Sequence, residues 1–192
     1  MTNKNLKSDE DILVAAINRG DQDAFKQIIE AYQDKIMRVC MGFVGNREDA
    51  EDLAQDVFIQ LFKSSSGLRG EARLSTWLYR VAVNKSLNHI RSRKLKKQYE
   101  NIEISDAFDP ASGEEADDRI KASDHRKALR EAIGRLPENQ RTAFILQKYE
   151  ELSYEEISKV MKLSLSSVQS LIFRARKNLQ DYLLEYFRKN FT

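Results

Sequence analysis

The chain has 192 residues, of which 32% are charged and 41% hydrophobic, so it can bury a core and remain soluble. Its formal net charge is +2, and no apolar run approaches the roughly 20 residues that a membrane-spanning helix needs. The polar, acidic start MTNKNLKSDE is unlike a signal peptide, and a single cysteine, Cys40, fits a core position in a reducing compartment. We therefore expect a cytoplasmic protein that is not inserted in a membrane.

Helical periodicity dominates from the start of the chain, and we find no convincing strand. The first predicted helix is capped by Ser8, with Asp11 three residues on, and ends at Gly20. The second runs from about residue 21 to residue 44, and Gly45 and Asn46 end it and start the next. Their apolar stripes are Ile12, Leu13, Ala16 and Ile17 in the first helix, and Phe25, Ile28, Ile29, Tyr32, Ile36, Val39, Cys40 and Phe43 in the second.

Two more helices complete the N-terminal half. The third, REDAEDLAQDVFIQLFKS, has apolar residues at spacings of three and four, which predicts a buried stripe. That stripe comprises Ala50, Leu53, Ala54, Val57, Phe58, Leu61 and Phe62. The connection SSSGLRGEARL leads to a fourth helix from about residue 75 to residue 97. Four such helices can form one bundle.

The segment YENIEISDAFDPASGEEADD interrupts this pattern with a proline, a glycine and an acidic run, which predicts a linker. Helical periodicity resumes near Ala122, where Leu129, Ile133 and Leu136 precede a helix that begins at Pro137. The expected fold is all-α, with two helical domains joined by an acidic linker. We place the domain boundaries at residues 1–98, 99–121 and 122–192.

The stretch SYEEISKVMKLSLSSVQSLIFRARKNL predicts two helices separated by the residues KLS. Ser153 and Glu156 have capping-box spacing at the start of the first helix, and Leu163 can fill the corner between the two. In the second helix, Val168, Ile172, Ala175 and Leu179 share one face. The opposite face is rich in small polar and cationic residues: Ser166, Ser167, Gln169, Ser170, Phe173, Arg174 and Lys177. A helix of this kind, held by a short-turn partner, suits the DNA major groove, whereas a plain helical hairpin leaves Phe173 unexplained.

Charge is strongly segregated along the chain. From Arg69 to Lys97 there are nine Lys or Arg residues and one acid, Glu71, whereas from Glu100 to Asp118 there are eight acids and no Lys or Arg. The basic helix therefore favours a polyanionic partner. Within it, Arg80, Asn84 and Asn88 form a polar row suited to unstacked bases, while Lys85, Arg91 and Arg93 can neutralise phosphates. Trp77 and Val81 are expected to lie mostly in the core.

No catalytic site is evident in the sequence. His89 and His125 have no Cys or His neighbour at metal-ligand spacing, and there is no P-loop or nucleophile elbow. His89 is expected to face solvent or DNA. We expect no enzymatic activity, no cofactor, no metal and no small-molecule substrate.

Three motifs together resemble a known family. The stretch LPENQRTAFILQKYEELSYEEISKVMKLSLSSVQSLIFRARKNL resembles the promoter-recognition domain of bacterial sigma factors of the extracytoplasmic-function (ECF) group. DAEDLAQDVFIQLF resembles their polymerase-binding helix, and LRGEARLSTWLYRVAVNKSLNHIRSRK resembles the segment that melts promoter DNA. Together they cover about residues 23–97 and 122–186, in the order and at the separation typical of the family.

The chain departs from the family pattern at two places. Leu68 precedes Arg69 and Gly70, where family members often have a phenylalanine. The recognition helix usually carries Gly-Thr-Val-Lys/Arg-Ser-Arg, whereas here the corresponding residues are SSVQSL, so two cations are missing. The second departure suggests an upstream sequence preference particular to this chain.

The resemblance implies roles for three sets of residues. Polymerase docking, on the clamp helices of the largest subunit, falls to Asp49, Asp52, Gln55, Asp56 and Phe58. For the acids, helix-dipole stabilisation is the simpler interpretation. Recognition and melting of the downstream promoter element fall to Arg69, Arg73, Trp77, Arg80, Asn84, Lys85, Asn88, Arg91 and Arg93, and recognition of the upstream element falls to the exposed face of the last helix.

The implied partners are core RNA polymerase, including the flap of its second-largest subunit, promoter DNA and an anti-sigma factor. The acidic linker is either a solubilising tether or a segment that enters the RNA path of the polymerase. The alternative function is a stand-alone repressor or activator with a helix-turn-helix, which needs neither the acidic helix face nor the basic, Asn-bearing helix. A helical adaptor that binds only protein does not explain the charge segregation.

Overall fold

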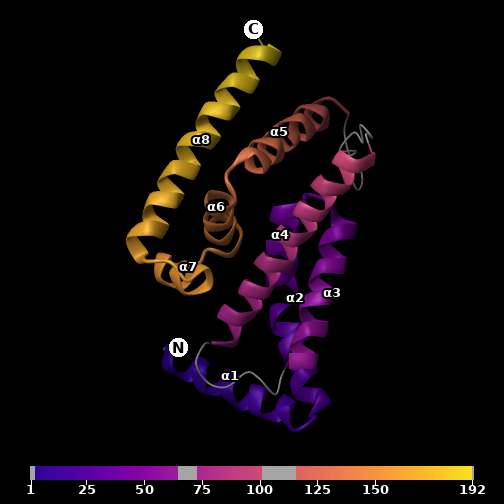
Figure 1. Ribbon diagram of the computed structural model, residues 1–192, viewed down its shortest axis with the longest axis vertical. Helices are drawn as coiled ribbons and strands as arrows, with labels where there is room; N and C mark the ends of the chain where they lie inside the picture. The colour runs from indigo at the N-terminus through magenta and orange to yellow at the C-terminus, as the bar shows by residue number, and fades with distance from the viewer. Residues whose placement is uncertain (1–2, 65–72, 101–115, 192) are drawn as a thin grey trace. The chain divides into compact units, whose positions relative to one another are not determined.

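The computed structural model describes residues 3–64, 73–100 and 116–191, all in helices or the short turns between them (Figure 1). The chain divides into two compact units, one built on residues 1–94 and the other mainly on residues 95–192. The expectation of an all-α fold with two helical domains is confirmed. Over the described residues, no helix is both long enough and apolar enough to cross a membrane.

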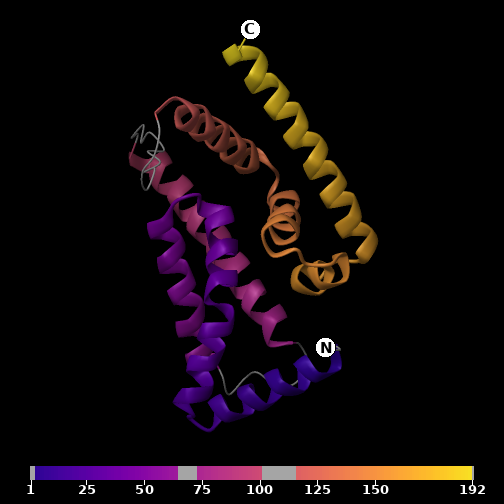
Figure 2. The same ribbon diagram turned by 180° about the vertical axis from the view of Figure 1, so that it is seen from behind.

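The N-terminal unit contains α1 (Asn3–Asn18), α2 (Gln22–Val44), α3 (Arg47–Ser64) and α4 (Leu74–Glu100). α2, α3 and α4 lie side by side, and α1 packs across one end of α2 (Figures 1 and 2). The most deeply buried side chains come from all three long helices, among them Ile28, Ile36, Val57 and Leu78. These residues recur at three- and four-residue spacings, so each helix turns one apolar face to a shared core.

Caps define the boundaries of α2. The carboxylate of Asp21 accepts hydrogen bonds from the backbone N–H groups of Asp23 and Ala24, at 2.9 and 3.0 Å. Gly45 ends the helix with φ at +75°, a conformation that favours glycine because it has no Cβ. Both ends lie where the sequence predicts them.

Cys40 lies in this core, where α2 meets α4, and its side chain is fully buried. Burial raises the pKa of the Cys40 thiol to about 11, and the nearby Ser86 hydroxyl of α4 offsets only part of that rise. The thiol therefore stays neutral and acts as a small apolar side chain, as expected from the sequence.

Four local predictions for the N-terminal unit are wrong. Ser8 lies inside α1 and does not cap it, since residues 3–7 contain no glycine or proline and the helix starts earlier. Ile12 and Phe62 were expected in buried stripes but are 61% and 63% exposed. His89, expected to face solvent or DNA, instead points towards Asp49 of α3, and its side chain is 31% exposed.

The second unit contains α5 (Ala116–Arg135), α6 (Glu138–Glu150), α7 (Tyr154–Met161) and α8 (Leu165–Phe191). α5 and α6 both pack against α8, and α7 occupies the corner between α6 and α8 (Figure 2). Ile145, Leu146, Ile157 and Ile172 form its buried centre. Leu129 and Leu163, expected to be apolar contacts, are 39% and 37% exposed, because each lies at the margin of this small core.

The expected linker, residues 99–121, is partly helical. α4 continues to Glu100 and α5 already begins at Ala116. Residues 101–115 lie outside the described part of the chain.

Candidate nucleic-acid interface

The turn between α7 and α8 is built by local hydrogen bonds. Ser153 and Glu156 form a complete capping box at the start of α7, with the Glu156 carboxylate accepting from the Ser153 backbone N–H at 2.9 Å. Lys162 ends α7 with φ at +55°. The Ser164 hydroxyl then accepts from the Ser167 backbone N–H at 3.2 Å and caps α8. The end of α7 and the start of α8 are therefore both set by residues of the turn, Lys162 and Ser164.

α8 has one buried and one exposed face, as the sequence predicts. Val168, Ile172 and Ala175 are at most 1% exposed and pack into the core of this unit. All seven residues expected to contact the upstream DNA element are exposed: Ser166, Ser167, Gln169, Ser170, Phe173, Arg174 and Lys177. Phe173 is 70% exposed, which is unusual for a phenylalanine and leaves its ring free to meet a base methyl group.

Polar contacts fix α8 against α6. The Asn178 side-chain amide donates to Gln140 Oε1 at 2.8 Å, and the Arg176 guanidinium donates to Gln147 Oε1 at 3.1 Å. Arg176 is thereby drawn towards α6. Among the described residues, Arg174 instead donates only to the backbone carbonyl of Ser170, one turn earlier, at 3.2 Å. Of the two arginines, Arg174 is the one suited to contact a base.

In α4, Asn84 and Asn88 are exposed one turn apart, as expected for a row that meets unstacked bases. The Asn88 side-chain carbonyl accepts from Arg91 at 3.4 Å, so these two side chains are coupled. Arg73, Trp77 and Arg80 are half-buried, with Arg80 less exposed than expected. Arg69, also in the expected set, lies outside the described residues.

The outer face of α3 carries the expected acidic row in part. Asp52, Gln55 and Asp56 are exposed. Phe58, the apolar member of the docking set, is only 8% exposed because it shares the buried face of α3 with Ala54 and Leu61. Its ring belongs to the core, so little of it is accessible to a partner surface.

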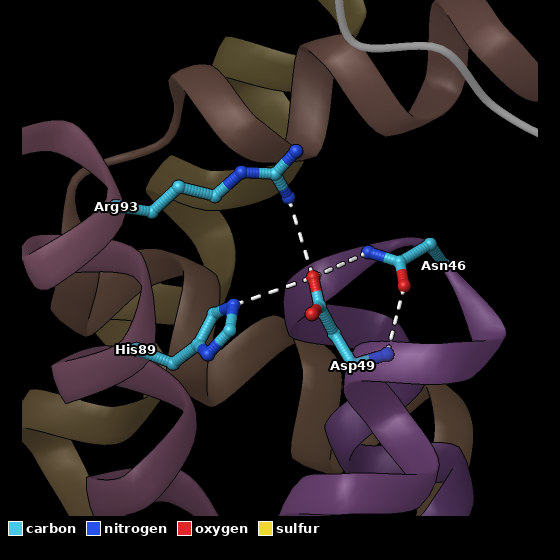
Figure 3. Close-up of polar contacts among 4 residues, drawn as sticks. All are labelled: Asn46, Asp49, His89 and Arg93. Carbon is cyan, nitrogen blue, oxygen red and sulfur yellow. Dashed lines mark hydrogen bonds and ion pairs between the residues drawn. The ribbon is translucent and has the colours of Figure 1, made fainter. Parts of the chain in front are cut away.

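Asp49, the remaining member of the docking set, is engaged within the unit (Figure 3). Its Oδ2 atom accepts from Asn46 Nδ2 at 2.7 Å and from the Arg93 guanidinium at 3.3 Å, and His89 Nε2 lies 3.3 Å away. In return, Asn46 Oδ1 accepts from the Asp49 backbone N–H at 2.9 Å and caps α3. Asp49 therefore ties the start of α3 to α4, and its side chain is only 27% exposed.

A second ion pair joins the same two helices. Lys85 Nζ of α4 lies 3.1 Å from Asp56 Oδ2 of α3, with 25% and 55% of the two side chains exposed. The sequence predicts a phosphate contact for Lys85, and the family resemblance implies polymerase docking for Asp56, but neither predicts that the two side chains pair. Neither partner could be found from spacing along the chain, because 29 residues separate them.

Sequence reasoning also missed an apolar continuation of the α3 face. Ile59 is 48% and Phe62 63% exposed, and the Phe62 ring meets the Phe25 ring of α2 edge-on, with 5.4 Å between centroids. Ile59 follows Gln55 and Asp56 by four and three residues, which puts it on their side of the helix. The only sequence signal is that Ile59 falls outside the buried stripe.

The described residues contain no cluster of three or more His, Cys, Asp or Glu side chains that could hold a metal ion. What they do contain is an exposed helix-turn-helix face, an exposed Asn row on a basic helix and an acidic helix beside it.

Comparison with known proteins identifies these elements. Residues 28–96 match the family model for sigma-70 region 2, and residues 126–179 match the model for sigma-70 region 4. The RNA polymerase sigma-H factor of Pseudomonas aeruginosa is 35% identical over 183 residues, covering 92% of this chain and 95% of the relative. The ECF RNA polymerase sigma-E factor of Haemophilus influenzae is 32% identical over 175 residues, covering 88% and 92%. The chain is an ECF sigma factor of the sigma-70 family.

Solved structures agree with this ECF fold. The sigma factor RpoE of Bartonella quintana, solved in complex with the anti-sigma factor NepR, is 24% identical, with a TM-score of 0.64. The match covers 83% of this chain and 96% of that one. In this ECF sigma factor, the region 2 match includes the acidic face of α3 and the Asn row of α4, and the region 4 match includes the exposed face of α8.

Proposed function

We propose that this sigma factor docks on core RNA polymerase through the exposed face of α3 and directs it to specific promoters. The docking residues are Asp52, Gln55 and Asp56, which would meet the clamp helices of the largest subunit. Support comes from their shared exposure on one side of α3. A row of carboxylates favours a basic partner surface and repels an acidic one.

Recognition of the downstream promoter element falls to α4. Asn84 and Asn88 each offer a donor and an acceptor, which suits the edges of unpaired bases. Phosphates of the same strand are neutralised by neighbouring cations, a contribution that carries no sequence information. The expected set comprises Arg69, Arg73, Trp77, Arg80, Asn84, Lys85, Asn88, Arg91 and Arg93.

Recognition of the upstream element falls to the exposed face of α8, inserted in the major groove. Its small serines allow close approach, while Gln169 and Arg174 can pair with base edges and Phe173 can contact a thymine methyl group. Few cations lie at the start of this helix, so much of its affinity must come from base contacts.

The remaining assignments follow from family membership. The protein would act in the cytoplasm without enzymatic activity of its own, and would also contact the flap of the second-largest polymerase subunit. An anti-sigma factor would hold it inactive, as NepR is bound to RpoE in the related structure. The functional domains would be residues 1–98 and 122–192, with residues 99–121 between them.

The observation that carries this function is the acidic face of α3 beside the Asn row of α4 in one unit. A stand-alone repressor or activator would share the helix-turn-helix of α7 and α8 but would have no use for that unit. Transcription separates the two functions, because a repressor cannot start transcription with core polymerase.

The test is transcription with purified protein, core polymerase and a library of promoter fragments from the source genome. We expect transcripts that start at a defined set of fragments and require the added protein. If the protein binds specific duplex fragments but core polymerase still produces no transcript from them, the stand-alone regulator is the correct function.

A further inference from the structure

Three basic side chains of α4 face α3. Lys85, His89 and Arg93 are spaced four residues apart, so they lie along one side of the helix. Opposite them on α3 stand Asp56 and Asp49, two turns apart. Lys85 pairs with Asp56 at 3.1 Å, and both Arg93 and His89 lie 3.3 Å from Asp49 (Figure 3 shows the Asp49 end). We call these contacts the α3–α4 ion-pair ladder.

The ladder joins residues of two different surfaces. Lys85 and Arg93 belong to the proposed phosphate-binding set of α4, whereas the two carboxylates belong to α3. A DNA phosphate that approaches either cation must therefore displace the carboxylate already paired with it, or share the cation with that carboxylate. Binding then releases fewer counterions, because part of each cation's charge is balanced inside the protein.

We propose that Asp49 and Asp56 are built-in counterions that restrain phosphate binding by Arg93 and Lys85 in the free protein. The inference rests on the proposed role of α4 in holding single-stranded promoter DNA. It assigns these acids an effect on DNA affinity that is separate from polymerase docking.

The exposure of the ladder decides how strong this restraint is. The paired side chains of Lys85 and Asp56 are 25% and 55% exposed, and those of Arg93 and Asp49 are 42% and 27% exposed. Solvent and salt screen pairs at such positions, so each contributes little to stability and can be displaced. The ladder lowers DNA affinity without blocking it.

The two carboxylates differ in how firmly they are held. Asp49 also accepts from Asn46 at 2.7 Å and lies in the first turn of α3, so its loss would disturb the helix start. Asp56 lies mid-helix with its side chain more than half exposed, and only Lys85 donates to it among the described residues. Asp56→Asn is therefore the cleaner variant.

The experiment measures binding of the full-length protein, without polymerase, to a fluorescently labelled single-stranded oligodeoxynucleotide over a series of KCl concentrations. Asp56→Asn should bind about 2- to 5-fold more tightly at low salt, the range expected for an exposed ion pair. The slope of its plot of log K against log salt should be steeper by up to about 0.7, the value expected when one additional phosphate of a single strand is neutralised.

A matched control removes the same charge from the same helix. Glu51 of α3 pairs with Arg47 of α3 at 2.6 Å and takes no part in the ladder. Glu51→Gln should change the affinity much less than Asp56→Asn and leave the salt slope unchanged. Equal effects of the two variants would show a general loss of negative charge and overturn the proposal.

A double-mutant cycle isolates the pair. In a Lys85→Gln background, Asp56→Asn should bring no further gain in affinity, because the cation that it restrains is gone. A full gain in that background contradicts the ladder, as does a loss of affinity in Asp56→Asn alone. If no variant binds the oligonucleotide, the restraint is refuted, whereas the transcription test still decides the proposed function independently.

Discussion

At the scale of single residues, α8 shows how neighbouring arginines acquire different tasks. Arg176 donates to Gln147 of α6 at 3.1 Å and so contributes to packing within its unit. Arg174, two residues earlier, is exposed and, within the part of the chain that the structure describes, donates only to the carbonyl of Ser170 in its own helix. A backbone carbonyl that already accepts a helical hydrogen bond is a weak competitor, so the Arg174 fork can turn to a guanine edge.

Arg174→Ala should therefore weaken promoter binding selectively at one base-pair position of the upstream element. A bidentate arginine–guanine pair accounts for roughly a 5- to 150-fold preference for the correct base. The measurement is transcription by reconstituted holoenzyme from a promoter series with single substitutions. The control is Arg188→Ala, which removes an exposed cation from the last turn of α8. A uniform loss over the whole series would mean that Arg174 contacts phosphate.

At the scale of elements, the helix ends explain much of the N-terminal fold. α1 stops where Gly20 adopts φ at +86°, and the Gly20 N–H donates to the carbonyl of Ile17 at 2.9 Å. Asp21 then caps α2 at once, so the chain changes direction within three residues. Gly134 differs, since it lies within α5 near its end and needs no unusual backbone conformation.

Replacing each glycine by alanine should have opposite effects on stability. A Cβ at either site meets nothing within 4 Å, so packing does not interfere. Gly20→Ala should lower the free energy of unfolding by about 1 kcal/mol, because an L-residue is strained in the left-handed region. Gly134→Ala should raise it by about 0.5 kcal/mol, because alanine favours helix. Urea denaturation followed by circular dichroism measures both, and shifts in the same direction would contradict this account.

At the scale of the whole molecule, function is divided among surfaces that different helices supply. The proposed docking face lies on α3, the proposed single-strand face on α4 and the proposed duplex-reading face on α8. The first two share the α3–α4 ion-pair ladder, whereas the third belongs to the other unit. To weaken docking without disturbing DNA recognition, a substitution must therefore be made at an α3 residue that is not part of the ladder.

Asp52 meets that condition, since its side chain is exposed and forms no hydrogen bond or ion pair with another described residue. Asp52→Lys should weaken binding to core polymerase about tenfold or more, because a like charge would then face the basic partner surface. The matched control is Asp34→Lys, the same reversal at an exposed site of α2. Co-purification with core polymerase measures both variants. Normal binding by Asp52→Lys, with its helical content intact, would remove the docking assignment.

Much of this architecture follows from the sequence because it depends on local rules. Caps and glycines determine where α2, α7 and α8 begin or end, and helical spacing separates the buried from the exposed face of α8. The exposed face of α8 was predictable for that reason: a residue's side of a helix depends only on its position along the chain.

Only the tertiary structure decided how far each apolar stripe is covered and which charges meet. Phe58 and Phe62 are equally apolar on one helix, yet Phe58 is 8% exposed and Phe62 is 63% exposed. Asp49 and Asp56 read alike as surface acids, but each meets a basic residue of α4. Periodicity gives the direction of a side chain within its own helix. What lies opposite that side chain depends on how helices distant in sequence pack together.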